Sequence, residues 1–255
     1  MMFAALVAAA AIAATLLAVL GLAASRRVVP RSILESHNTV VGHGYAVLSL
    51  FIGILLALMV VAVWERYVEA EEITEREANA LADLYTDAAA FPEPDRTRLR
   101  ERIREYVLAV ETDEWRAMAE REESPRAWQA YAAIRRAYLE VTPNTMREAL
   151  WLEQSLDRLD ILADARRLRL LHSRARLPAA MWVVLSVLSL ATIGFSYLFG
   201  VRDPRLHAVV SGAIAAALAL TLTLIWALQR PFGHLAGQPP DAFVELREVM
   251  EESER

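Results

Sequence analysis

Residues 45–90 read YAVLSLFIGILLALMVVAVWERYVEAEEITEREANALADLYTDAAA, and this stretch decides the fold. Its first part, from Tyr45 to Trp64, contains no charged residue. About 20 apolar residues in a helix cross a hydrocarbon layer roughly 30 Å thick. No glycine or proline follows between Trp64 and Ala90, and apolar residues keep a helical period there. We therefore predict one long helix that crosses a membrane and continues into water.

Three further apolar runs predict three further membrane helices, at residues 1–24, 179–199 and 206–228. The first run also has the length of a secretory signal peptide, and Gly21-Leu22-Ala23 would be an acceptable cleavage site. A signal peptide has its basic residues before the apolar run, whereas Arg26 and Arg27 follow it here. We therefore favour a retained membrane helix over a signal peptide.

The segments between these runs have a different composition. Residues 25–44 are predicted to be a short polar connection, residues 65–178 a charged extramembrane domain, and residues 229–255 a weakly ordered acidic tail. In the connection, Ser32-Ile33-Leu34-Glu35 fits a capping box at which a brief interfacial helix would begin. In the tail, a short acidic amphipathic helix is expected around Phe243, Val244, Leu246 and Val249. Within 65–178, Ser124 before Pro125 and Thr145 before Glu148 are typical helix starts, and no alternating strand pattern occurs. The predicted fold is all-α: two membrane helices, an inserted helical domain and two more membrane helices.

Composition agrees with this segregation, because 56% of residues are hydrophobic and 23% are charged, which is unusual for one soluble domain. Residues 65–177 hold 24 acidic residues against 19 arginines, which accounts for the whole net charge of -5. We interpret most of these charges as solvated faces of amphipathic helices. The acidic balance argues against nucleic acid as a partner.

The side of the membrane on which the domain lies is not decided by its charges alone. The short connections at 25–44 and 200–206 carry five arginines, which favours placing them inside the cell and the domain outside. A denser basic cluster precedes the third apolar run, at Arg166, Arg167, Arg169, Arg174 and Arg176. We favour a multi-pass protein of the bacterial inner membrane with the domain and both termini in the cytoplasm.

Motifs that carry catalysis or bind cofactors are not found in the sequence. It has no glycine-rich phosphate loop, no His-Glu-x-x-His helix, no Gly-x-Ser-x-Gly turn and no cysteine. His37 and His43 are six residues apart, which is not the spacing of one helical face, so a metal or proton site there is disfavoured. We predict no catalytic, metal or cofactor site, and no enzymatic activity.

The order of segments and several local motifs resemble the bestrophin-like family of bacterial and plant membrane proteins of unknown function. The motifs are Ala62-Val63-Trp64-Glu65-Arg66-Tyr67-Val68-Glu69-Ala70, then Glu77-Ala78-Asn79-Ala80-Leu81-Ala82-Asp83-Leu84-Tyr85, the Phe91-Pro92 break, Tyr106 to Val110, Glu114-Trp115 and Met118. Bestrophins, to which that family has a distant likeness, are oligomeric anion channels with cytosolic helical domains. The resemblance therefore implies a homo-oligomer, such as a pentamer, whose partners are the lipid bilayer and small ions.

The helix at 45–64 is the predicted pore helix, because polar and glycine residues precede it and acidic residues follow it. The pore-lining candidates are Ser49, Leu50, Phe51, Gly53, Ile54 and Leu55. The vestibule candidates are Glu65, Glu69 and Glu72. Acidic rings attract cations, so we expect weakly selective or cation-preferring conduction, in contrast to an anion channel.

Two other functions compete with the channel. One is a membrane-anchored interaction or signalling module whose helical domain binds a soluble partner, which exposed apolar patches on residues 95–176 would favour. The other is an intramembrane enzyme, which is disfavoured because the first, third and fourth apolar runs have no ionisable residue in their centres.

Overall fold

The computed structural model describes residues 2–233 and 241–252, and every regular element in those ranges is helical. In chain order, the elements are α1 (Met2–Val28), α2 (Arg31–Asp87), the 3₁₀ turn η1 (Ala88–Ala90), α3 (Asp95–Ala109), the π-helical turn η2 (Val110–Glu114), α4 (Trp115–Glu120), α5 (Pro125–Leu139), α6 (Met146–Arg174), α7 (Ala179–Ser196), α8 (Pro204–Leu228) and α9 (Asp241–Glu252). Four of them, α1, α2, α7 and α8, are long and apolar enough to cross a membrane.

The helices form two compact units. Unit 1 consists of residues 1–65 and 176–229, and unit 2 of residues 66–175 and 230–255. Helix α2 contributes its first part to unit 1 and its last part to unit 2 as one uninterrupted helix of 57 residues. Each unit has a hydrophobic core of its own.

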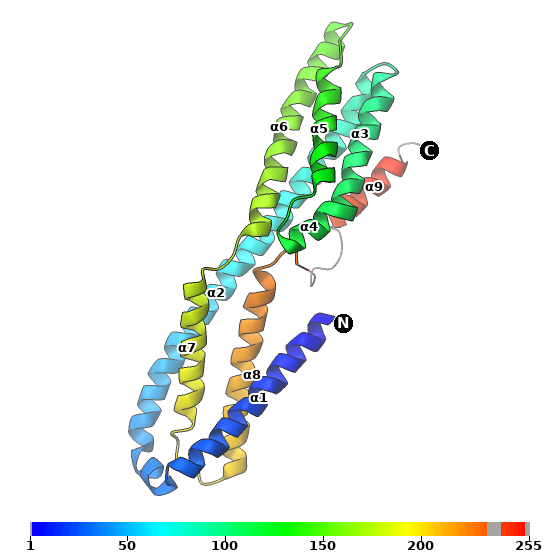
Figure 1. Cartoon of the computed structure of the whole chain (residues 1–255). Coiled ribbons are helices and arrows are strands. Elements are labelled where there is room, and N and C mark those ends of the chain that lie inside the picture. Colours follow the sequence, from blue (N-terminus) through cyan, green and yellow to red (C-terminus); the bar gives the residue numbers. More distant parts are fainter. Residues whose placement is uncertain (1, 234–240, 253–255) are drawn as a thin grey trace. The chain divides into compact units, whose positions relative to one another are not determined.

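In unit 1, helix α1 lies along α8, as Figure 1 shows. A close approach is possible because α8 has a glycine at the contact: a Cβ on Gly212 would lie 2.9 Å from the Thr15 side chain. The Thr15 hydroxyl donates to the Gly212 carbonyl at 3.3 Å. The core of unit 1 gathers Ile52, Leu56, Met59 and Val63 of α2 with buried leucine and isoleucine side chains of α7 and α8.

The residues predicted as a polar connection at 25–44 are almost entirely helical. Helix α1 ends at Val28 and α2 already begins at Arg31. The polar residues here are satisfied within the helix, since the His37 and His43 rings contact the carbonyls of Ile33 and Thr39, four residues earlier. The brief helix expected to begin at Ser32 is therefore the first part of α2, which continues without a break into the predicted membrane helix, because polarity does not by itself end a helix.

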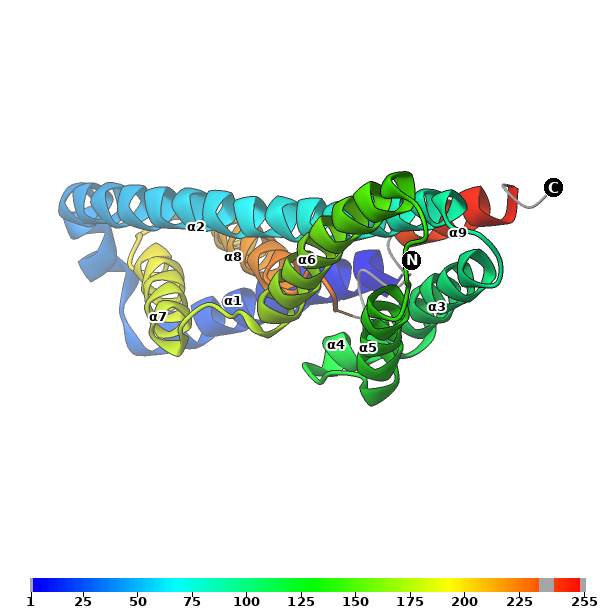
Figure 2. The same ribbon diagram turned by 90° about the horizontal axis from the view of Figure 1, so that it is seen from above.

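In unit 2, helices α3, α4 and α5 lie together, as Figure 2 shows, and α3 packs along α5. The two predicted helix starts are confirmed. Ser124 Oγ accepts a hydrogen bond from the Ala127 backbone amide at 3.2 Å, and Thr145 Oγ1 accepts one from the Glu148 backbone amide at 3.1 Å. The core unites side chains of α2, α3, α5, α6 and α9, among them Leu84 and Ile103.

The acidic tail contains the short amphipathic helix predicted around Phe243 and Val249, and this helix is packed against unit 2. Of residues 229–255, those at 241–252 form α9, and Phe243, Leu246 and Met250 on one face of it are buried in the core of unit 2. The fold therefore uses this segment as a packed helix, because three apolar residues at intervals of three and four residues form an apolar stripe on its surface. The part of the tail at 234–240 lies outside the described residues.

Candidate functional site

The exposed face of α2 is the first candidate for a functional surface. Ile52, Leu56, Met59 and Val63 turn into unit 1, whereas Leu50, Phe51, Gly53 and Ile54 are exposed. The exposed apolar side chains of this segment are Val47, Leu50, Phe51, Ile54, Leu58, Val61 and Trp64. Two of the pore-lining candidates are placed differently: Leu55 packs against the core of unit 1, and Ser49 is partly buried.

The same face of α2 changes from apolar to acidic along the helix. Phe51, Leu58, Glu65 and Glu72 follow one another at intervals of seven residues, and all four are exposed. Residues seven apart lie on nearly the same face of a helix, with a drift of about 20° per interval. Glu69 is also exposed, and its carboxylate lies 3.8 Å from the His172 ring of α6. All three vestibule candidates are therefore accessible carboxylates on α2.

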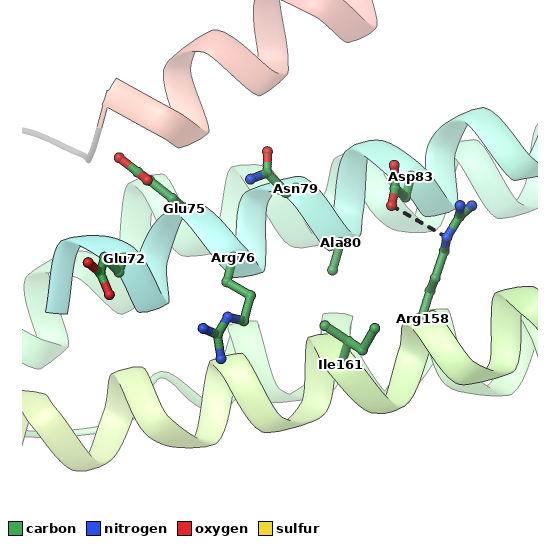
Figure 3. Close-up of a pocket in the computed structure, with 8 residues that line it drawn as sticks. All are labelled: Glu72, Glu75, Arg76, Asn79, Ala80, Asp83, Arg158 and Ile161. Carbon is green, nitrogen blue, oxygen red and sulfur yellow. Dashed lines mark ion pairs between the residues drawn. The ribbon is translucent and has the colours of Figure 1, made fainter. Parts of the chain in front are cut away.

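Glu72 lines a shallow hollow of about 340 Å³ between α2 and α6, shown in Figure 3. Its wall consists of Glu72, Glu75, Arg76, Asn79, Ala80 and Asp83 from α2 and of Arg158 and Ile161 from α6. Arg158 Nε lies 3.4 Å from the Asp83 carboxylate, and the same guanidinium pairs with the buried Asp87. Glu72, Glu75 and Asp83 are thus the acidic side chains of α2 that are exposed in this wall, and of these Asp83 pairs with Arg158.

Unit 2 also contains a buried ionic network that sequence reasoning missed. Arg169 is fully buried, and its Nε donates to Glu77 at 2.6 Å while its Nη2 donates to Glu77 at 3.0 Å and to Glu114 at 2.6 Å. Arg166 pairs with the other oxygen of Glu114, and the Tyr106 hydroxyl donates to Glu77. Two carboxylates and two guanidiniums therefore balance one another away from water.

Electrostatics keeps the Arg169 guanidinium charged. Burial by itself would lower the pKa of Arg169, but Glu77 and Glu114 raise it well above its ordinary value. Burial, reinforced by the negative charge of Glu77, raises the pKa of Tyr106 well above its usual range, so the phenol remains a donor. A buried charge costs several kcal/mol unless it is paired, which is why these residues must be positioned together.

A sequence signal for the network exists. Glu77 lies four residues after Ile73 and four before Leu81, two apolar residues that turn into unit 2. A carboxylate in the apolar stripe of an amphipathic helix is buried with it, and it then requires a cationic partner. The second carboxylate of the network, Glu114, ends the π-helical turn η2 between α3 and α4, a local backbone feature for which the sequence gives no clear sign.

Comparisons with solved structures support the fold. A crystal structure of a membrane protein matches with a TM-score of 0.69 and 16% identity, over 95% of this chain and 96% of that chain. A crystal structure of a bacterial bestrophin homologue from Klebsiella pneumoniae, which carries a point mutation, matches with a TM-score of 0.71 and 14% identity, over 95% of this chain and 98% of that one. At these identities the likeness shows a common helical fold and no more.

Sequence comparison identifies the family. No curated protein matches the chain. The family profile of the bestrophin-like domain matches residues 12–235, which is most of the chain and includes α2, α7, α8, the buried network and α1 from residue 12 onward. The resemblance inferred from the local motifs is thus confirmed, and the chain belongs to the bestrophin-like family.

Proposed function

We propose that the chain is a homo-oligomeric ion channel of the bacterial inner membrane in which α2 lines the pore. The observation that carries the proposal is the exposed face of α2, on which apolar residues from Val47 to Val61 are followed by Glu65, Glu69 and Glu72. Among the four candidate membrane helices, as far as the chain is described, only α2 has carboxylates on the face that continues its apolar stripe. Copies of this face around an axis would form an apolar constriction followed by acidic rings.

The proposed arrangement in the membrane has two helices before and two after an inserted domain. In it α1, α2 up to Trp64, α7 and α8 cross the bilayer, and residues 65–178 form the extramembrane domain. The described part of the tail joins this domain through Phe243. The domain and both termini lie in the cytoplasm. A cysteine introduced at the exposed Glu120 should then resist a membrane-impermeant thiol reagent in intact cells and react after lysis; labelling in intact cells would reverse the orientation.

Acidic rings make the proposed pore weakly selective or cation-preferring, because fixed negative charge raises the local concentration of cations. Purified protein in liposomes should pass small ions. Changing Glu65, Glu69 and Glu72 together to Gln should lower the ratio of sodium to chloride permeability, measured from reversal potentials, by roughly threefold or more. The matched control changes Glu101, Glu105 and Glu120, which removes the same charge elsewhere in the domain.

The constriction is tested separately by Phe51→Ala, which should raise the flux because it widens the apolar stretch. Leu17→Ala on the exposed face of α1 is its control and should leave the flux unchanged. Liposomes without flux in any of these forms, or a triple variant with unchanged selectivity, would contradict the channel.

The second candidate function is a membrane-anchored module that binds a soluble partner. It is favoured by large apolar side chains that unit 2 leaves exposed on α5 and α6, namely Trp128, Leu139, Leu150, Ile161 and Leu171. Saturable binding of a purified soluble protein to unit 2, in the absence of ion flux, would support this function over the channel.

A further inference from the structure

A second hollow of unit 2 lies between α5 and α6 and has a different chemistry from the one along α2. Its volume is about 280 Å³, at the lower end of the range of small-molecule sites. The wall is formed by Trp128 and Tyr131 of α5, by Ala163, Arg166, Arg167, Leu170, Leu171 and Arg174 of α6, and by Glu123 before α5. Three arginines and two aromatic rings thus face a cavity that has one carboxylate.

The apolar part of this wall is unusually open for side chains of its size. Trp128 is 54% exposed and Leu171 is 56% exposed. An indole ring has a large apolar surface, and leaving it in water forgoes the free energy that a ligand or partner would recover by covering it. The two side chains therefore offer an apolar platform for a flat or branched organic group.

The cationic part of the wall contains a donor that the protein does not satisfy. The Arg166 side chain is almost fully buried, and its guanidinium lies 5.2 Å from the Trp128 ring centre and 5.5 Å from that of Tyr131. One terminal nitrogen pairs with Glu114, but the buried Nε has no hydrogen-bond partner in the described structure. A buried donor without an acceptor is unfavourable, and an oxygen atom of a ligand would satisfy it.

At the rim of the cavity, an incoming anion could replace an exposed ion pair with little loss of free energy. Arg174 Nη2 donates to Glu123 at 2.7 Å, and the two side chains are 50% and 44% exposed. Such exposed ion pairs contribute little, so a carboxylate can take the place of Glu123 beside Arg174. Arg167, which pairs with the exposed Asp164, is a second exposed cation at the same rim.

From these four features we infer that the cavity between α5 and α6 binds a small organic anion, a carboxylate carried on a single ring or a short branched chain. The acid group lies between Arg167 and Arg174, with Arg166 behind it, and the apolar body covers Trp128 and Leu171. A cavity of about 280 Å³ matches a ligand with one ring or a short branched chain. The inference depends on unit 2 alone, so it stands or falls independently of ion conduction.

Benzoate is a suitable probe, and its binding to the purified full-length protein in detergent is measured by saturation-transfer NMR and by calorimetric titration. We expect saturable binding of benzoate, with benzamide and acetate at least tenfold weaker, because the first lacks the charge and the second the apolar body. Benzamide also controls for partition into the micelle. Equal affinity for benzoate and benzamide, or no saturable binding of benzoate, would overturn the inference.

Variants of the rim give effects of opposite sign. Arg167→Gln with Arg174→Gln should weaken benzoate binding at least tenfold, whereas Glu123→Gln should strengthen it severalfold because Arg174 loses its competing partner. Glu122→Gln, the exposed neighbour outside the wall, is the matched control for Glu123, and Arg102→Gln on α3 is the control for the arginines. All these side chains are exposed or half-exposed, so the melting temperature should not change. An unchanged affinity in the double variant would rule out the proposed site.

The platform is tested by Trp128→Ala, which should weaken benzoate binding about fivefold, and by Trp128→Phe, which should retain most of it. If the double arginine variant, Trp128→Ala and the control variants all bind alike, the anion does not occupy this cavity.

Discussion

Arg169 has a fully buried guanidinium whose three nitrogens all have partners, two carboxylates and the Met118 sulfur at 3.0 Å. The guanidinium carbon of Arg169 lies 5.9 Å from the centre of the Phe243 ring of α9. This residue therefore connects α2, α4, α6 and α9 through one polar group. Such a network costs desolvation energy and in return allows only one arrangement of the helices that share it.

Arg169→Met should destabilise unit 2 by about 3–5 kcal/mol, because Glu77 and Glu114 then keep buried charge without their shared partner. Adding Glu77→Gln should restore part of the loss, since it removes the carboxylate left without a cation, whereas Glu114 keeps Arg166. The measurement is the melting temperature of the detergent-solubilised protein. Arg167→Met, two residues away but exposed to water, is the control and should change stability by less than about 0.5 kcal/mol. Equal effects of the two substitutions would show that the network does not stabilise the fold.

Among the helices, α2 and α9 illustrate how far an element depends on its surroundings. Helix α2 has no proline and continues from Arg31 to Asp87, so its length follows from local propensity and hydrophobic periodicity. Helix α9 is short, acidic and preceded by residues rich in glycine and proline, so its sequence predicts an amphipathic helix in a weakly ordered tail, without a packing partner. Its order arises from packing, because isolated helices of this length are marginal in water.

Phe243→Ala should therefore lower the stability of unit 2 by about 3–5 kcal/mol, the usual cost of removing a fully buried aromatic ring. Val249→Ala on the exposed face of the same helix is the matched control and should have an effect below about 0.5 kcal/mol. Both variants are compared by thermal unfolding and by the rate of trypsin cleavage within α9. If the Phe243→Ala protein unfolded at the same temperature as the Val249→Ala protein and was cleaved by trypsin at the same rate, α9 would not be packed against the core of unit 2.

For the whole molecule, assembly is the property that decides between a pore and an anchor. The chain contains no cysteine, so single cysteines can be introduced without removing any. In the proposed oligomer the exposed face of α2 surrounds the axis, whereas the exposed face of α1 is turned to lipid.

Leu58→Cys on α2 should consequently form an oxidative cross-link between copies in native membranes, while Leu17→Cys on α1 should not. Both leucines are more than 60% exposed in the single chain, so accessibility of the thiol does not distinguish them. Cross-linked species are counted on non-reducing gels after mild copper oxidation. Cross-linking at Leu17 with none at Leu58 would place another helix at the interface and remove the support for α2 as the pore helix.

The sequence by itself determined the all-α class, the four apolar helices, the uninterrupted α2 and the family, because each depends on local composition and on helical period. It did not determine which charges are solvated. Glu77 lies in the apolar stripe of α2, but its partner Arg169 is 92 residues away and appears in the sequence as one arginine among many, and only the fold brings the two together. Likewise, only packing separates Leu55 from its neighbour Ile54 and moves Phe243 from a predicted tail into a core. Burial depends on contacts between distant segments, and these exist only once the tertiary structure has formed.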